Sequence, residues 1–269
     1  MTRSYIIPML ATLTCLACAS SSRAESPASS ASPSAGADFR WQKKIEAPVQ
    51  FELHNINGGL EAEAATDDTL SIVAVKTGKR EDFARVRIVV REDGGTVVAC
   101  ALWPGQSTCA RDQKVTGGNG KVDVRVDFVV RLPAKVAQLE AETMNGSLTA
   151  ANLAGRARLR TMNGHVNVVA AGSVDAQTMN GSVVAQVTAS GAPVHLASKS
   201  GRVELTLPAS ANADVEASTL HGTISSAFGA VPPPPFPGMP NKAQFRVGAG
   251  GVRIALETLN GDVILRRGT

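Results

Sequence analysis

Three stretches of the chain repeat one pattern: residues 139–148 read LEAETMNGSL, residues 157–166 read ARLRTMNGHV and residues 174–183 read VDAQTMNGSV. Their glycines are 18 and 17 residues apart, and variants of the motif occur before and after these three stretches. A fixed period of this kind indicates a repeat architecture. The turn residues of the whole series are Asn57, Gly58, Asn145, Gly146, Asn163, Gly164, Asn180, Gly181, Gly201, His221, Gly222, Asn260 and Gly261.

The residues on either side of each motif alternate between apolar and polar. The fifth residue before the glycine is always aliphatic, as in Ala141 and Leu159, and so is the second residue after it, as in Leu148. The sixth residue before the glycine is polar in most repeats, as in Glu140. A period of two predicts short strands with one buried face and one face in water. We therefore expect two strands per repeat, joined by an Asn-Gly turn whose residues tolerate a positive φ.

Two folds are compatible with this pattern. Asn-Gly between alternating strands is a strong hairpin signal, which favours an antiparallel meander. Parallel stacking of the repeats would instead place Glu140 over Arg158 and Arg158 over Asp175, so that opposite charges alternate. It would also place Leu139 beside Ala157, which matches a large side chain with a small one. We favour an all-β, right-handed β-solenoid of strand–turn–strand repeats, with the meander as the alternative.

The two ends of the repeat region differ from its middle. Residues 70–132 contain longer alternating runs, which predict longer strands that cap one end. Residues 231–240 are rich in proline, which cannot donate to a strand ladder, so this segment is expected to protrude as a loop. Residues 262–267 are expected to form an exposed last strand, whose Arg266 and Arg267 discourage edge-to-edge pairing.

The N-terminal segment predicts export. Residues 1–24 combine a basic start, an apolar run and a small-x-small cleavage site, as a signal peptide does. Leu16-Ala17-Cys18 also resembles the end of a lipoprotein signal, so lipid attachment at Cys18 stays open. Residues 25–40 resemble a Ser/Ala/Pro-rich tether, and residues 41–269 are expected to form a single β-repeat domain.

The apolar run of the N-terminal segment is shorter than the roughly 20 residues that a transmembrane helix needs. We therefore expect no transmembrane span. The expected location is the periplasm, an anchor on the outer membrane, or the cell surface.

Two cysteines remain once residues 1–24 are set aside. Cys100 and Cys109 flank a Pro-Gly turn. In an oxidising compartment, an even pair of this kind predicts a disulfide that closes a hairpin.

The composition gives no support for nucleic-acid binding. Removal of Arg3 and Arg23 with the signal leaves 25 basic and 23 acidic residues. Nucleic-acid binding would need clustered Lys and Arg with stacking aromatic side chains, and Tyr5, the single tyrosine, lies in the predicted signal.

The sequence predicts no catalytic, cofactor-binding or metal-binding residues. The four histidines fall at four different positions of the repeat, whereas a metal site needs ligands that converge. Hydrolase nucleophile and phosphate-loop motifs are absent from the sequence. The acids of the repeats interleave with arginines and indicate a solvated charge ladder. These histidines and acids are His54, His165, His195, His221, Glu140, Glu142, Asp175, Glu204, Glu216 and Glu257.

The turn asparagines and the methionines beside them allow two interpretations. Asn145, Asn163 and Asn180, with Met144, Met162 and Met179, would form a recognition ridge if their side chains pointed outward. The alternative, which we favour, is that the amides hydrogen-bond to one another and hold the corners of the coils.

The segment VVRLP at 129–133, followed by residues 139–148 and their Thr-x-Asn-Gly successors, resembles a bacterial putative-adhesin β-strand-repeat family, a domain of unknown function. The resemblance covers roughly residues 48–267, and Ser200 and His221 depart from the asparagine of the pattern. It implies a β-solenoid in the cell envelope, with no established catalytic residues.

The resulting hypothesis is a non-enzymatic, adhesin-like binding or scaffold module with a protein or glycan ligand. The alternatives are a self-associating structural envelope protein and, less favoured, an enzyme acting on envelope polysaccharide.

Overall fold

A computed structural model describes residues 38–115, 121–231 and 239–268. The expected signal peptide and Cys18 lie outside the described residues, as do most of the tether and of the proline-rich loop. One 3-10 helix, η1 (Arg80–Arg85), accompanies the strands. The strands are β1 (Asp38–Lys44), β2 (Val49–His54), β3 (Leu60–Ala64), β4 (Thr69–Gly78), β5 (Arg87–Asp93), β6 (Thr96–Leu102), β7 (Val124–Leu132), β8 (Val136–Asn145), β9 (Leu148–Leu153), β10 (Arg156–Asn163), β11 (Val166–Ala170), β12 (Val174–Asn180), β13 (Val183–Val187), β14 (Val194–Ser200), β15 (Val203–Leu207), β16 (Ala213–His221), β17 (Ile224–Ser226), β18 (Asn241–Val247), β19 (Val252–Asn260) and β20 (Val263–Arg267).

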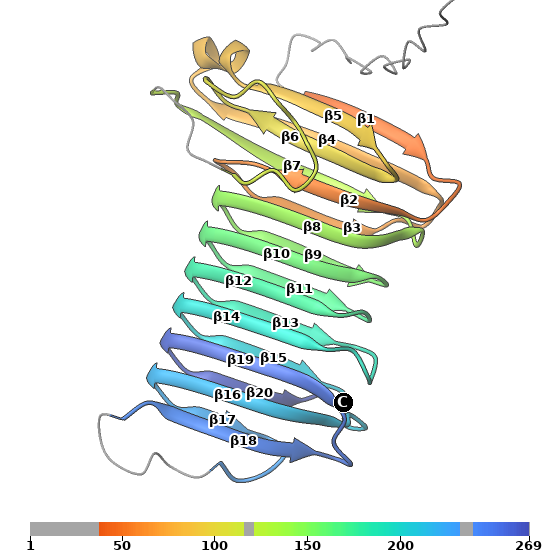
Figure 1. The fold of residues 1–269 in the computed structure, drawn as a ribbon. Coiled ribbons are helices and arrows are strands. Elements are labelled where there is room, and N and C mark those ends of the chain that lie inside the picture. The colour runs from red at the N-terminus through yellow and green to blue at the C-terminus, as the bar shows by residue number, and fades with distance from the viewer. Residues whose placement is uncertain (1–37, 116–120, 232–238, 269) are drawn as a thin grey trace, which may run out of the picture.

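The strands form two ten-stranded sheets that face each other along a stack of coils (Figure 1). Sheet A has the order β1-β4-β7-β3-β9-β11-β13-β15-β20-β17, and sheet B has the order β18-β16-β19-β14-β12-β10-β8-β2-β6-β5. Each central coil gives one strand to each sheet, and neighbouring coils pair in parallel. The β-solenoid is therefore confirmed, and the antiparallel meander is wrong for the repeats.

The register between coils is the one that the sequence predicts. Arg158 pairs with Glu140 on one side and with Asp175 on the other. On the buried face of sheet B, Ala157 pairs with Leu139, so a small side chain lies beside a large one. This complementarity lets the coils fill the space between the sheets, where Leu159 and Leu196 are fully buried.

Longer antiparallel strands cap one end of the stack, as the sequence predicts. β4 pairs antiparallel with β7 and with β1 in sheet A, and β5 pairs antiparallel with β6 in sheet B. Among the described residues, no helix has the length and apolar character needed to cross a membrane.

The coils do not stack in the order of the chain. The coil β2–β3 lies between β6 and β7 on one side and β8 and β9 on the other. At the opposite end, the coil β19–β20 lies between β14–β15 and β16–β17. The chain reverses at β18, which runs antiparallel to β16, and β19 then adds to the other side of β16. The expected exposed strand at 262–267 is therefore wrong, because β20 is paired on both sides.

Glycine is needed at these turns mainly because neighbouring coils stack closely, and less because of a positive φ. Gly146 and Gly164 do not have a positive φ, and neither do the asparagines before them. A Cβ on Gly164 would lie 2.1 Å from the carbonyl oxygen of Gly146 in the preceding coil. The expectation of a positive φ is thus wrong at Gly146 and Gly164, where the backbones meet too closely for any side chain. It holds at Gly58, Gly181 and Gly261, whose φ values are 121°, 148° and 154°.

A hydroxyl ladder, which the sequence analysis did not identify, fastens the same corners. Thr161 Oγ1 donates a hydrogen bond of 2.9 Å to the carbonyl of Gly146, and the equivalent residue of each neighbouring coil does the same. The donors are Thr143, Thr161, Thr178, Ser198, Thr219 and Thr258. These side chains are buried, so each bond satisfies two groups that water does not reach.

Candidate functional site

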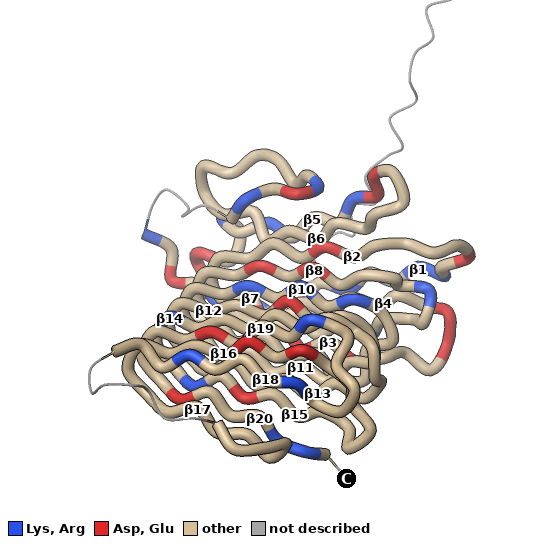
Figure 2. Tube along the Cα trace, turned by 60° about the horizontal axis from the view of Figure 1, so that its bottom comes forward, with Lys and Arg blue, Asp and Glu red and all other residues tan. Residues whose placement is uncertain are grey.

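The outer face of sheet B carries a charge ladder in its middle, where acidic and basic residues lie on neighbouring strands (Figure 2). The row runs from Glu140 on β8 through Arg158 on β10 to Asp175 on β12. Arg158 lies 3.5 Å from Glu140 and 3.4 Å from Asp175, and Arg160 lies 3.3 Å from Asp175. The predicted interleaving of acids and arginines is confirmed on this face.

Asp175 and His195 form a hydrogen-bonded pair within the ladder. Nδ1 of His195 donates to Oδ1 of Asp175 at 3.1 Å, and Nε2 of Gln177 donates to the same oxygen at 2.7 Å. Burial alone would raise the pKa of Asp175, but the bonds from His195 and Gln177 and the charge of Arg160 lower this pKa to about 2. The bond to Asp175 raises the pKa of His195 above its usual value.

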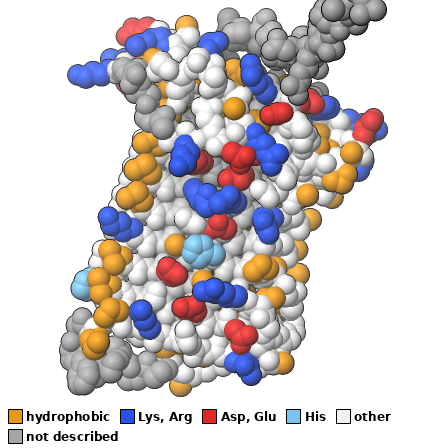
Figure 3. All heavy atoms as spheres, in the orientation of Figure 1, with side chains coloured by type: hydrophobic (Ala, Val, Ile, Leu, Met, Phe, Trp, Pro, Cys, Tyr) orange, Lys and Arg blue, Asp and Glu red, His pale blue; other side chains and the backbone are white. Residues whose placement is uncertain are grey.

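A groove of about 550 Å³ crosses this ladder. Its walls come from β10, β12, β14 and β19, and its charged lining is Arg156, Arg158, Asp175, His195, Arg253 and Glu257. Figure 3 shows charged side chains and a histidine gathered in the middle of one face of the stack. Side chains of Arg158 and His195 are 40% and 41% exposed, so a ligand in the groove could reach them.

Sequence reasoning named Glu257 as a ladder acid but did not identify Arg156 or Arg253 as groove residues. Arg253 and Glu257 join the site because β19 pairs directly with β14, which places Ala255 beside His195. The order of the repeats along the chain would instead put Glu216 in that place. The sequence contains one sign of this changed order, the gap of 39 residues between Gly222 and Gly261, which is about two periods.

The predicted turn residues form one edge of the stack. Asn163 Nδ2 donates to Asn145 Oδ1, and Asn180 Nδ2 donates to Asn163 Oδ1, both at 2.8 Å. The amides therefore hydrogen-bond along their own ladder, as favoured from the sequence. Met162 and Met179 beside them are 39% and 40% exposed, and Figure 3 shows hydrophobic side chains along one edge.

The expected disulfide is present between Cys100 and Cys109, with a Cα–Cα distance of 5.8 Å. Cys109 packs with Val98, Cys100 and Leu102 in a small cluster on the outer side of β6. The segment that follows β6 also reaches β2, because the amide of Asp112 donates to Oε2 of Glu52 at 2.9 Å. The disulfide thus holds this segment, 103–115, over the outer face of sheet B.

The histidines occupy separate places, as their repeat positions predict. His195 lines the groove, whereas His54 is buried on β2. His165 lies at a turn, where its Nδ1 accepts a hydrogen bond of 3.0 Å from the amide of Ser182. His221 ends β16 and pairs with Asn260.

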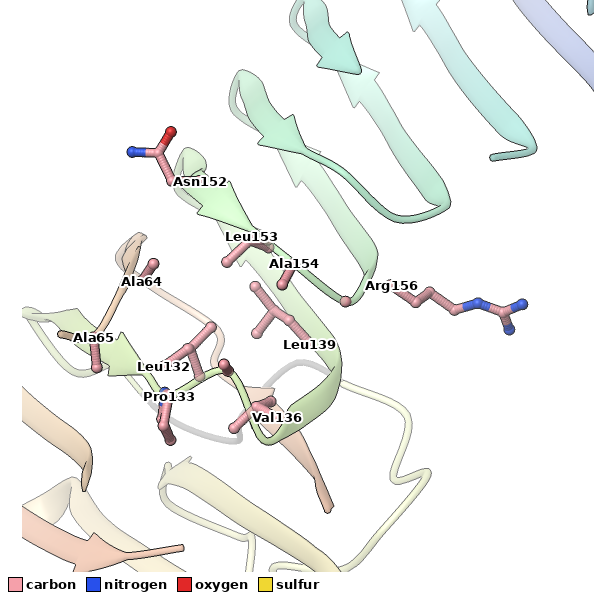
Figure 4. A pocket seen from close by; sticks show the side chains of 12 residues that line it. Ala64, Ala65, Leu132, Pro133, Val136, Leu139, Asn152, Leu153, Ala154 and Arg156 are labelled. Carbon is pink, nitrogen blue, oxygen red and sulfur yellow. The ribbon is translucent and has the colours of Figure 1, made fainter. Parts of the chain in front are cut away.

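A second cavity is apolar and small. It measures about 70 Å³ and is lined by alanine, leucine and valine side chains, among them Leu132, Val136 and Leu139 (Figure 4). The side chains of Asn152 and Arg156 point away from it (Figure 4). With no polar side chain directed inward, this cavity offers no groups for chemistry or specific recognition.

Comparisons with known proteins identify a family but no activity. The family model described as Toastrack DUF4097 matches residues 107–265. None of the curated proteins matches the chain.

Several solved structures are similar at low identity, and three of them are named below. One is a putative cell adhesion protein from Clostridium sporogenes, with 13% identity and a TM-score of 0.47 over 86% of this chain and 100% of that one. The second is a putative adhesin from Bacteroides fragilis, with 10% identity and a TM-score of 0.36 over 86% and 97%. The third is a putative lipid binding protein from Parabacteroides distasonis, with 11% identity and a TM-score of 0.31 over 87% and 98%.

Proposed function

The chain belongs to the Toastrack DUF4097 family, and on that premise we propose that it is a non-enzymatic, adhesin-like binding module of the cell envelope. The module is exported and is exposed at the cell surface. A periplasmic location would instead make it a scaffold for periplasmic partners. It holds a protein or glycan ligand against the outer face of sheet B.

The observation that carries this proposal is the groove between β10 and β19. Two of its arginines are held by neighbours in adjacent coils: Nε of Arg156 donates to Ser173 at 2.9 Å, and Arg253 lies 3.0 Å from Glu216. Side chains that are already ordered lose little conformational entropy when a ligand binds. The groove therefore suits a ligand that presents acidic groups along an extended polar chain.

Binding at the groove is tested with a charge-removing double variant. Arg156→Ser with Arg253→Ser removes two cations from the groove walls, and we expect binding to isolated envelope fractions or to immobilised surface glycans to fall at least tenfold. The matched control is Arg87→Ser with Arg91→Ser on β5, which removes two exposed cations from the far end of the same sheet. An equal loss of binding in both double variants would show a general charge effect and contradict a site in the groove.

The proposed location in the cell is tested by the access of protease and antibody to the protein. We expect protease and antibody to reach the protein on intact cells without permeabilisation of the outer membrane. Protection until permeabilisation would overturn the adhesin-like role and redirect the search to periplasmic partners.

A further inference from the structure

A short row of residues forms the lip of the groove that crosses sheet B. Each of them stands one position before a paired residue of β10, β12, β14 or β19, so the four lie side by side across these strands. In order, they are Arg156, Ser173, Pro193 and Arg253, and all four line the groove. The lip therefore has an arginine at each end and two smaller residues between them, which leaves space for a ligand along the row.

Both arginines have charge to offer a ligand. Nε of Arg156 donates to Oγ of Ser173 at 2.9 Å, and Arg156 forms no ion pair with any residue that the structure describes. Arg253 lies 3.0 Å from Glu216, but both side chains are exposed, at 76% and 47%, and such a pair contributes little in water. A carboxylate on a ligand would gain charge-assisted hydrogen bonds at either end of the lip.

The spacing of the two arginines matches an extended peptide. Arg156 on β10 and Arg253 on β19 are three strand positions apart, because β12 and β14 lie between them. Neighbouring strands lie about 4.8 Å apart, so the two backbones are separated by about 14 Å. An extended peptide rises about 3.4 Å per residue, and residues four positions apart lie on the same side of it, separated by about 14 Å. A peptide along the lip can therefore place one carboxylate at each arginine.

His195 provides a third contact between the two arginines. It lies on β14 and lines the same groove. Its Nδ1 donates to Asp175 at 3.1 Å, which leaves Nε2 for a ligand. In the neutral ring Nε2 is an acceptor and repels a carboxylate, whereas in the protonated ring it is a donor and binds one. The affinity of the groove for an acidic ligand should therefore depend on the protonation of His195.

The charged groups around His195 decide where it takes up its proton. The hydrogen bond to Asp175 on β12 raises the pKa of His195, and burial lowers it. The charges of Asp175 and of Glu257 on β19 raise this pKa further, whereas the charge of Arg160 on β10 lowers it, and the net pKa is above the usual value. The other charged side chains of the groove are Arg156, Arg158 and Arg253. Glu257 lies four residues after Arg253 on the same strand, so it repels a carboxylate from the side opposite the lip.

We propose that the groove binds an extended acidic segment of another protein, with carboxylates four residues apart on Arg156 and Arg253 and a further contact to protonated His195. This inference rests on the proposed function, because it names the ligand of the same groove. A protein segment suits the lip since every second side chain of an extended chain points to the same side. Binding should therefore depend both on the spacing of the acids and on pH.

The first test measures spacing with the whole chain and two fluorescent ten-residue peptides of identical composition. One peptide carries glutamates at positions 3 and 7, and the other carries them at positions 3 and 4. We expect the first peptide to bind at least fivefold more tightly at pH 6, and Arg156→Gln or Arg253→Gln to remove this difference. The matched control is Arg91→Gln, which removes an exposed cation from β5 at the far end of sheet B and should keep the difference.

The second test measures the affinity of the first peptide between pH 9 and pH 6. Its glutamates stay ionised throughout this range, since their pKa is about 4.3. We expect the affinity to rise at least threefold as the pH falls. His195→Gln should lower the affinity at pH 6 to that of the unaltered protein at pH 9.

The outcomes separate this inference from the proposed function. Equal affinity for the two peptides would overturn the spacing, and an affinity independent of pH would overturn the contact to His195. Tighter binding of polygalacturonate, lost in the same arginine variants, would overturn the peptide as the ligand while the groove kept its proposed function. The proposed function itself fails on a different result, namely unaltered binding of Arg156→Ser with Arg253→Ser to envelope fractions.

Discussion

At the scale of single residues, the glycine of each turn is fixed by its neighbour in the next coil. A Cβ on Gly164 would lie 2.1 Å from the carbonyl oxygen of Gly146, far inside the contact distance of the two atoms. Gly164→Ala must therefore push two coils apart. We expect this change to lower the free energy of unfolding by about 2–3 kcal/mol, as measured by urea denaturation.

The control for this prediction is Gly191→Ala. Gly191 has a φ of 96° and no atom within 4 Å of an added Cβ, so only backbone strain opposes the change. That strain costs about 1 kcal/mol. A loss at Gly164 no larger than the loss at Gly191 would contradict the role of close stacking.

The pair Asp175–His195 makes stability depend on pH in a defined window. The pKa of Asp175 is lowered to about 2, so its contribution is present above the unfolded value near 3.9 and is lost as the pH falls toward 2. The pKa of His195 is raised, so its contribution is full below the unfolded value near 6.5 and is lost as the pH rises through the folded pKa.

We expect His195→Gln to be most destabilising between about pH 4 and 6.5. The effect should stay below about 1 kcal/mol, because the histidine side chain is 41% exposed and water screens the pair. Unfolding free energies of both proteins between pH 3 and 9 would test this. A difference that grows above pH 7 would have the wrong sign for this linkage.

At the same scale, the sequence predicts which residues of neighbouring coils lie in register better than it predicts how closely their backbones approach. The position of Arg158 between Glu140 and Asp175 follows from the period of the repeat alone. The bond from Thr161 to Gly146 does not, because it depends on how closely two backbones approach. The repeat identifies the glycine of each turn, but it does not show that close contact between backbones is what requires a glycine there.

At the scale of elements, the segment 103–115 follows β6, lies over sheet B and is not described by the repeat pattern. Every residue of β6 is buried, because the core covers one side and this segment covers the other. The disulfide was predictable from two cysteines around a turn. The contact of the segment with Glu52 was not, since it joins residues 60 positions apart.

Removal of the disulfide should loosen this segment while the coils stay intact. We expect Cys100→Ser with Cys109→Ser to lower the free energy of unfolding by about 2–3 kcal/mol, because the unfolded chain regains the entropy of the closed loop. Hydrogen exchange should accelerate within 103–115 and remain slow in β10 and β12. Reduction of the unaltered protein serves as the control and should have the same effect. Equal acceleration in all strands would contradict a local role.

At the scale of the whole molecule, the repeat predicts which residues share a row but not which coils are neighbours. Glu52, Glu140 and Arg158 share a row by their distance from the turn glycine. The insertion of the coil β2–β3 next to β8 depends on where β4 to β7 fold, which the repeat does not encode. The candidate groove rests on the insertion of β19 beside β14, and for that reason the sequence alone did not predict it.

The insertion at the C-terminal end makes the last residues of the chain an internal coil. In repeat proteins each coil contacts only its neighbours, so removal of an end coil breaks one interface. A truncation after Gly248 removes β19 and β20, which contact a coil on both sides. We expect it to abolish slow hydrogen exchange in β16 and to lower stability far more than deletion of residues 38–44. That deletion is the control, because β1 is an edge strand that pairs with β4 alone in the described sheet. If hydrogen exchange in β16 stays slow in the truncated chain, β16 has paired directly with β14. The coil β19–β20 would then not be needed for the stack.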